Sequence, residues 1–273
     1  MNRPITRTLG LAVAAIALIG AALPAGAMTL DEAKAAGKVR IGIQADNCPW
    51  GCLSTTGEAQ GFDAAVGRAF AKSLGLEAEF VPLAVANRIP ALTANRVDML
   101  IASVGITAER AKSVQFSPPY AANTLYVTAA KTADLPDAAA LSGVSVGVPR
   151  SAPMDTILTK EAPSADIRRF DDDAANIQAL LSGQVQAVGS NQFYIQRLEK
   201  ASAGTYENKF KIGQLYQGVA TRLGESDWNT ALNGFLKSYI GSEGYNASHA
   251  EWLQVPTTDL PATIDGVSFT VSQ

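Results

Sequence analysis

The chain has 273 residues, 22 of them basic and 25 acidic, and a formal net charge of −3. This balance argues against a basic nucleic-acid-binding surface. Apolar residues make up 47% of the chain, which is enough for a sizeable core. At about 100 to 200 residues per domain, the length fits one large or two medium domains.

Residues 1–27 have the pattern of a secretory signal peptide. Arg3 and Arg7 precede a short apolar stretch that ends in small residues at 25–27. The stretch is short for a membrane span, so we expect cleavage after Ala27 rather than a retained anchor. Loss of the two arginines moves the formal net charge from −3 to −5. The mature protein is therefore expected to be periplasmic or secreted.

Residues 28–120 alternate between helical and strand patterns. Apolar residues recur at helical spacing in Gly61–Leu74, and a helix opens at Asn87–Asn95 with Pro90 tolerated in its first turn. The segment Ala45–Gln60 has loop chemistry. The other predicted elements are a short helix at Thr29–Ala36 and strands at Val39–Gln44, Glu77–Val81 and Met99–Ala102.

The same alternation returns after Pro118 and Pro119. Strands alternating with helices predict right-handed βαβ units and a mostly parallel sheet, and the repetition of the series predicts two lobes. Ligands of such sheets bind beyond the carboxyl ends of the strands. The predicted elements are strands at Leu125–Ala130, Val144–Val148 and Val185–Gly189, an extended segment at Tyr216–Arg222, and helices after Ser151 and at Ala174–Leu181, Asn191–Lys200, Trp228–Ile240 and Tyr245–Trp252.

The two cysteines, Cys48 and Cys52, lie in the short sequence CPWGC. A disulfide fits an oxidising compartment better than a metal site does, because zinc would need further thiols or histidines and His249 is the only histidine. We expect no metal and no cofactor.

The stretch Asp98–Tyr120 carries the main candidate for ligand binding. Thr107–Ala111 has the start signals of a helix, with Thr107 as its cap. Arg110 falls in the first turn, so its guanidinium and the free backbone N–H groups can face the same spot. Together they predict a receptor for one carboxylate. The alternative is a local ion pair with an acid such as Glu109.

Several segments resemble the periplasmic solute-binding proteins of polar amino-acid ABC transporters, bacterial extracellular solute-binding protein family 3. They are GFDAAVGRAFAKSLG at 61–75, NRIPALTANRVDMLIASVGITAERAKSVQFSPPY at 87–120, VGVPRSA at 146–152, and the strand leading to Asn191. The resemblance covers essentially the whole mature chain and is most specific from Gly61 to Tyr120.

The resemblance implies an α/β fold of the type II periplasmic-binding-protein kind. In this fold two lobes with mostly parallel sheets and helices on both faces are joined by two crossover hinge strands, and the ligand lies in the cleft. The implied division is a signal peptide at 1–27, lobe 1 at 28–123 and 218–273, and lobe 2 at 124–217.

The resemblance also assigns roles around the first lobe's part of the cleft. Arg110 matches the arginine that grips the ligand's α-carboxylate. Ser103 and Thr107 match positions whose hydroxyl or backbone groups line the same pocket. Gly105 falls where many relatives have Ser or Thr, so only its backbone can serve.

Three other positions carry open alternatives. Asp46 matches an acid that contacts an amino or amide group, or it forms an Asx turn in its loop. Arg88 matches the arginine of an NRIP motif that faces the ligand side chain in acidic amino-acid binders, or it is a solvated helix charge. Trp50 stacks on the ligand, or it packs against its own disulfide turn.

In lobe 2, Ser151 and Ala152 match the helix start that closes on the carboxylate, with Ser151 as the expected cap. Arg150 adds charge there or faces solvent. Asn191 departs from the family, which usually has an aspartate that pairs with the ligand's α-ammonium. An amide can still accept a hydrogen bond, but the charge-assisted part, on the order of 1 kcal/mol or more, is weakened.

The resemblance therefore implies the substrate-binding protein of an ABC importer. It would be a monomer that binds a polar or acidic amino acid, or an amino-acid-like organic acid, and delivers it to a membrane permease. The competing class is an exported enzyme on the same fold that resembles cyclohexadienyl or arogenate dehydratases, with Asp46 or Asp63 carrying the proton chemistry. A third class, an extracellular sensor module, lacks a signalling domain in this sequence.

Overall fold

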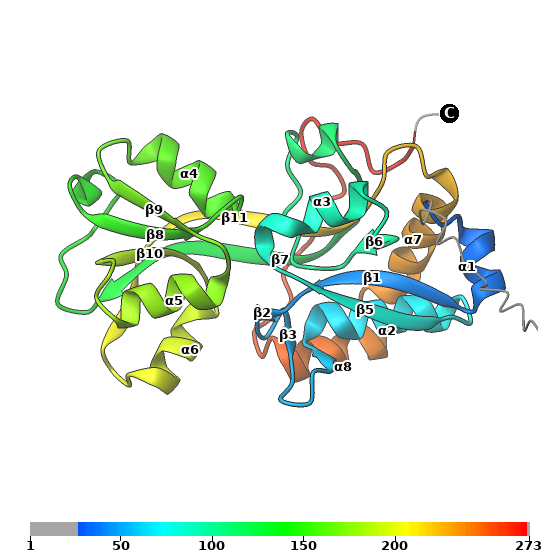
Figure 1. The fold of residues 1–273 in the computed structure, drawn as a ribbon, viewed down its shortest axis with the longest axis horizontal. Helices are drawn as coiled ribbons and strands as arrows, with labels where there is room; N and C mark the ends of the chain where they lie inside the picture. The colour runs from blue at the N-terminus through cyan, green and yellow to red at the C-terminus, as the bar shows by residue number, and fades with distance from the viewer. Residues whose placement is uncertain (1–26, 272–273) are drawn as a thin grey trace, which may run out of the picture.

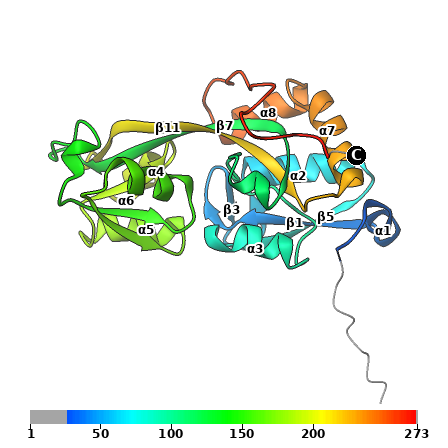
Figure 2. The ribbon, with the colours of Figure 1, turned by 90° about the horizontal axis from the view of Figure 1, so that it is seen from above.

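The computed structural model describes residues 27–271, so the predicted signal peptide lies outside the described residues except for Ala27. Two lobes lie side by side, and two long strands, β7 (Gln115–Ala130) and β11 (Tyr206–Thr221), run from one to the other (Figure 1). Viewed from above, the two strands form the connection between the lobes (Figure 2). They pair antiparallel along most of their length.

A single eight-stranded sheet passes through both lobes in the order β5-β1-β6-β11-β7-β10-β8-β9. In lobe 1, β1 pairs parallel with β5 and β6, and in lobe 2, β8 pairs parallel with β9 and β10. The pairs that involve β7 and β11 are antiparallel. The other six strands of the sheet are β1 (Lys38–Gln44), β5 (Glu77–Leu83), β6 (Met99–Leu100), β8 (Ser145–Pro149), β9 (Asp166–Phe170) and β10 (Ala187–Asn191).

Helices cover both faces of each half of the sheet, as the predicted α/β class requires. In Figure 1, α2 and α3 lie on opposite sides of β1, and α4 lies opposite α5 and α6. The helices are α1 (Leu30–Ala36), α2 (Phe62–Ser73), α3 (Arg88–Thr93), α4 (Pro153–Glu161), α5 (Asp173–Leu181), α6 (Tyr194–Ala201), α7 (Ser226–Tyr239) and α8 (Glu243–Trp252). No helix in residues 27–271 is long and apolar enough to cross a membrane.

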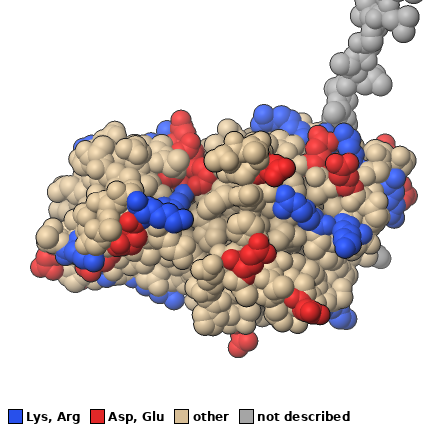
Figure 3. Space-filling model, turned by 90° about the horizontal axis from the view of Figure 1, so that it is seen from below, with Lys and Arg blue, Asp and Glu red and all other residues tan. Residues whose placement is uncertain are grey.

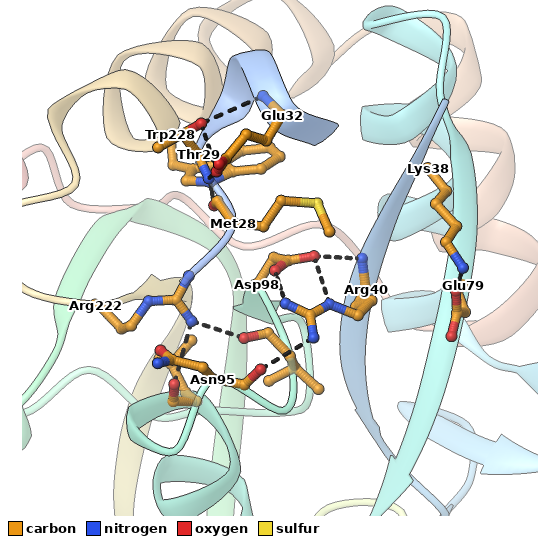
Figure 4. Close-up of polar contacts among 12 residues, drawn as sticks. Met28, Thr29, Glu32, Lys38, Arg40, Glu79, Asn95, Asp98, Arg222 and Trp228 are labelled. Carbon is orange, nitrogen blue, oxygen red and sulfur yellow. Dashed lines mark hydrogen bonds and ion pairs between the residues drawn. The ribbon is translucent and has the colours of Figure 1, made fainter. Parts of the chain in front are cut away.

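Lobe 1 has a core made from both ends of the chain. Phe62 and Phe70 from α2 pack with Trp228 from α7 and Tyr245 from α8, and all four are buried. Trp228 also donates its indole N–H to the carbonyl of Met28, 2.8 Å away (Figure 4). The segment 28–121 and the segment after β11 therefore form one hydrophobic unit.

A buried ion pair fastens β1 to the turn before β6. Asp98 is fully buried and accepts hydrogen bonds from the backbone N–H and the guanidinium of Arg40, with Arg40 Nη2 2.6 Å from Asp98 Oδ1. Arg40 also donates to the carbonyl of Asn95 (Figure 4). These contacts set the start of β6, and hence the loop after it that carries Ser103, Gly105 and Arg110.

The structure differs from the sequence prediction in the segment Ala45–Gln60. This segment contains a small three-stranded sheet, β2 (Asp46–Asn47), β3 (Gly51–Leu53) and β4 (Ala59–Gln60). A disulfide between Cys48 and Cys52 closes the turn between β2 and β3. Strands of two or three residues are too short to show the alternation that predicts a strand.

One predicted helix start, at Thr107, and one predicted helix cap, Ser151, are wrong. Thr107–Ala111 contains only a short 3₁₀ turn at Arg110–Lys112, although the Thr107 hydroxyl does accept from the backbone N–H of Arg110 at 3.2 Å. Ser151 does not cap α4, because its φ is +62° and Ala152 takes the cap position without a side-chain hydrogen bond. Pro153 begins α4, where its fixed φ and missing N–H favour the first position.

The space-filling view fits the weakly acidic composition. On the face shown in Figure 3, basic and acidic side chains are interspersed and separated by uncharged areas. No continuous basic stripe crosses that face, which is what a nucleic-acid surface would need.

Candidate functional site

One cavity, here called the central cavity, lies between the two lobes and is lined by residues of both. Several of its walls are strand ends: Gln44 is the last residue of β1, Ser103 follows β6, and Asn191 is the last residue of β10. Carboxyl ends of parallel strands are the usual ligand sites of α/β folds. Of the predicted site residues, the central cavity brings together Arg88, Ser103, Gly105, Ala152 and Asn191.

Arg88, at the start of α3, is buried and is not the solvated helix charge of the alternative interpretation. Its Nε donates to the carbonyl of Val85 at 3.0 Å, and its Nη1 donates to the carbonyls of Ala102 and Ser103 at 2.7 and 3.0 Å. All three acceptors are neutral, and burial lowers the pKa of Arg88. The side chain is thus held in place without a carboxylate on the guanidinium, and it faces the cavity.

Arg110 lies in an adjoining cavity, here called the arginine cavity, which it shares with Arg88, Val85 and Ser151. Its Nη1 donates to the Gly105 carbonyl and its Nη2 to the Ser151 carbonyl, each at 2.9 Å. Burial and the neighbouring Arg88 lower the pKa of Arg110 to about 9. Two guanidinium groups here repel each other, so an anion between them would be stabilised strongly.

The local ion pair with Glu109, the alternative role of Arg110, does not form. Glu109 instead pairs with Lys112 on the surface, at 2.5 Å. The backbone carbonyl of Gly105 accepts from Arg110 and so orients its guanidinium. A methyl group at Gly105 would lie 3.0 Å from Leu215 and 3.4 Å from Arg110 Nη1, so a larger residue there would crowd the guanidinium.

The other predicted residues lie outside the central cavity. Trp50 is fully buried, where it packs edge-on against Phe62 of lobe 1 and Phe193 of lobe 2, and it does not line the central cavity. Arg150 is exposed and pairs with Asp171 at 3.6 Å. Thr107 lies behind Arg110 and supports its backbone.

Asp46 joins the lobes rather than lining the cavity. Its Oδ2 accepts from the backbone N–H of Ala174 at 2.9 Å, in the first turn of α5, and its carbonyl accepts from Arg197 at 2.6 Å. The carboxylate therefore stabilises the N-terminal end of a helix in the opposite lobe. Together with the hydrogen bonds of Arg110 to Ser151 and of Asn191 to Asn47, these contacts hold the lobes closed on each other.

Five polar residues of the central cavity were missed by the sequence analysis: Gln44, Asn47, Asn123, Asp173 and Gln217. Asn123 and Gln217 lie on β7 and β11, and each has a buried amide oxygen with no partner within residues 27–271. Asp173 is the first residue of α5, just after β9. Its signal was available, since a polar residue after a strand of the parallel series is a site candidate, but β9 itself was not predicted.

Asp173 gives the site a testable pH dependence. Burial raises the pKa of Asp173 to about 7, while Arg197 and Arg88 act to lower it and Asp46 acts to raise it. The folded protein thus keeps a proton that the unfolded chain loses near pH 4, and ionisation of Asp173 lowers stability as the pH rises from about 4 to 7.

We therefore expect the free energy of unfolding of Asp173→Asn to increase relative to that of the wild type when the pH is raised from 5 to 8. The expected gain is on the order of 1 kcal/mol or more. Urea unfolding of the ligand-free proteins at both pH values measures this difference. An unchanged difference would show that Asp173 ionises near its ordinary pKa.

The acids proposed for the enzyme alternative are not placed for proton transfer in the cleft. Asp63 is fully buried and accepts from the Tyr120 hydroxyl at 2.7 Å, and it does not line the central cavity. Burial raises the pKa of Asp63 to about 6. Among residues 27–271, no cluster of three His, Cys, Asp or Glu side chains could hold a metal ion.

Comparison with known proteins gives the same fold and family. The model of "Bacterial extracellular solute-binding proteins, family 3" matches residues 39–255. The L-cystine-binding protein TcyJ of Escherichia coli is 26% identical over 232 residues, which cover 84% of this chain and 87% of that protein. An L-arginine-binding protein of Pseudomonas aeruginosa is 30% identical over 176 residues, or 63% of this chain and 68% of that protein.

Solved structures agree with this. A solute receptor for L-cysteine of Neisseria gonorrhoeae has a TM-score of 0.78 at 26% identity, covering 82% of this chain and 93% of its own. An ancestral amino acid-binding protein, described as a precursor of cyclohexadienyl dehydratase, has a TM-score of 0.74 at 26% identity, covering 81% and 97%. The two-lobed α/β fold predicted from the sequence is confirmed.

Proposed function

Because the chain belongs to family 3 of the bacterial extracellular solute-binding proteins, we propose that it is the substrate-binding protein of an ABC importer for a polar amino acid. Its ligand would be a polar or acidic amino acid, or an amino-acid-like organic acid, bound between the lobes. The protein would work as a monomer in the periplasm after loss of residues 1–27.

One observation carries this proposal. Arg88 and Arg110 share a cavity between the lobes, and the hydrogen bonds of both go to carbonyl groups. A carbonyl carries only a partial charge, so a ligand carboxylate would bind these guanidinium groups more strongly. The same anion would raise the pKa of Arg110, which burial and the neighbouring Arg88 lower to about 9.

Binding and transport would be linked through closure. A ligand that first reaches Arg110 on lobe 1 would be enclosed when lobe 2 brings Ser151, Ala152 and Asn191 against it. Closure buries the ligand's charges, so each must find a partner, and this requirement gives selectivity. The closed form would then dock on a membrane permease. A micromolar dissociation constant needs only about 8 kcal/mol.

The relatives support an amino acid as the cargo without fixing which one. Their names describe binding of L-cystine, L-arginine and glutamine. The dehydratase alternative gains some weight from the likeness to the ancestral binding protein. Against it stands the position of Asp63, which is buried, hydrogen-bonded to Tyr120, and not among the residues that line the central cavity.

A thermal-shift screen tests the proposal. Mature protein, stripped of ligand by unfolding and refolding, is heated with L- and D-amino acids, opines and small dicarboxylates. Binding to the native state must raise the melting temperature by mass action. We expect a clear shift with at least one amino acid. No shift with any of them, together with turnover of a cyclohexadienyl substrate seen by mass spectrometry, would favour the enzyme.

A further inference from the structure

We propose that Asp173 holds the ammonium group of the ligand, and that the ligand is therefore a zwitterion with a free ammonium group rather than an organic acid. The inference rests on the proposed function and narrows the class of ligand for the same cleft. It gives Asp173, on α5, the role that Asn191 on β10 was expected to have.

Asn191 is already committed to other contacts. Its Nδ2 donates to Asn47 Oδ1 across the cleft at 2.9 Å, and its Oδ1 accepts from the backbone N–H of Phe193 at 2.9 Å. The side chain is only 2% exposed. Asn191 therefore joins the two lobes and fixes the turn into α6. Binding an ammonium group there would compete with both hydrogen bonds.

Asp173 is the carboxylate of the central cavity. It is 3% exposed, and it is the only acidic residue among the described residues that line this cavity. Its oxygens accept hydrogen bonds from the Gln44 amide and the Tyr194 hydroxyl, which are both neutral. Arg197 and Arg88 are near enough to act on the pKa of Asp173, but neither forms an ion pair or a hydrogen bond with it. A buried carboxylate without a directly bound cation is costly, so an ammonium group hydrogen-bonded to it would be stabilised strongly.

Further acceptors line the same cavity. The amide oxygens of Asn123 and Gln217 are buried, and neither has a partner within the described part of the chain. Both residues lie on the paired strands β7 and β11, where Asn123 is opposite Leu215 and Gln217 is two residues further along. An ammonium group has three N–H donors. With Asp173, these two amides supply three acceptors for one such group.

The two charges of the site are arranged as a zwitterion requires. Arg88 lines both cavities; the arginine cavity adds Arg110, and the central cavity adds Asp173. A ligand carboxylate at the arginines thus places an attached ammonium group toward Asp173. A dicarboxylate without an ammonium group would leave Asp173 buried beside an anion or a neutral group. That penalty selects against organic acids.

Calorimetry with pairs of ligands tests the inference without any mutation. The pairs are L-glutamate with glutarate, L-glutamine with glutaramate, and L-arginine with 5-guanidinovalerate, which differ in the α-ammonium group. We expect the wild type to bind the amino acid of at least one pair, and to bind its deaminated analogue at least 30-fold more weakly. Equal binding of both members would overturn the inference and leave a carboxylate receptor standing. If none of these pairs binds, the amino acid with the largest shift in the thermal screen and its deaminated analogue form the deciding pair. Absence of binding by every amino acid of that screen would reject amino-acid binding in the cleft, and the inference with it.

Two variants then locate the ammonium contact. Asp173→Asn keeps an acceptor for the Tyr194 hydroxyl but removes the charge, and we expect it to weaken binding of the amino acid 10- to 100-fold while changing binding of the analogue less than threefold. Asp171→Asn is the matched control, because Asp171 is two residues away, exposed, and paired only with Arg150. Unchanged affinity for the amino acid in Asp173→Asn, in a protein that the wild type shows to be a binder, would return the role to another group.

Discussion

Arg110→Ala is expected to weaken amino-acid binding by roughly 2 to 5 kcal/mol, or about 30-fold to several thousand-fold. The loss is large because a carboxylate enclosed in the arginine cavity would keep Arg88 but lose the guanidinium that reaches lobe 2 through Ser151. Isothermal titration calorimetry with the best ligand of the thermal-shift screen measures the change in dissociation constant.

The control for this variant is Arg168→Ala. Arg168 lies on β9, where it is about half exposed and pairs with Asp166 at 2.8 Å. Its loss removes one positive charge from lobe 2 without touching either cavity, so we expect affinity within twofold of the wild type. If Arg110→Ala bound as tightly as Arg168→Ala, the arginine cavity would not be the carboxylate site.

Asp98→Ala is expected to lower the free energy of unfolding by about 3 to 5 kcal/mol, since it leaves the guanidinium of Arg40 partly buried without its carboxylate. The backbone N–H of Arg40 would lose its acceptor as well. Urea unfolding of the ligand-free protein measures the loss.

The matched control here is Glu79→Ala, which breaks a neighbouring ion pair in the same lobe. Lys38 and Glu79 are 2.7 Å apart, but each side chain is nearly half exposed (Figure 4). Surface pairs of this kind contribute below about 1 kcal/mol. Similar losses in the two variants would mean that the Arg40–Asp98 pair is no more important to the fold than a surface contact.

The sequence predicts the core of the fold well where elements are long and periodic. The helix of Gly61–Leu74 and the parallel strands β1 and β8 follow directly from their apolar spacing. Only the second part of β7, Leu125–Ala130, was predicted as a strand, because Pro118 and Pro119 normally end one. They lie where the ladder with β11 is irregular, since the register shifts on both sides of the pair between Pro119 and Gly218.

The residues of the candidate site also differ in how far the local sequence predicts them. Arg110 and Arg88 lie in local motifs, NRIP and the stretch after β6, and both could be found from one stretch of sequence. Asn123 and Gln217 could not, because they meet the other site residues only when lobe 2 and the paired strands are brought over lobe 1. Asp173 was missed because β9, the strand before it, was not predicted. Of the two roles considered for Trp50, stacking on a ligand does not fit, because side chains of both lobes bury it completely.

The two crossings of the chain between the lobes also determine the order in which the protein can be completed. Helices α4, α5 and α6 and strands β8, β9 and β10 lie in one unbroken segment between β7 and β11. The core of lobe 1 instead needs Phe62 and Trp228, which are separated by more than half the chain. During synthesis from the N-terminus, the whole sequence of lobe 2 is therefore present before the last segment of lobe 1 has been made. The earlier half of lobe 1 must wait with exposed apolar surface, which is the state most open to aggregation or to a chaperone.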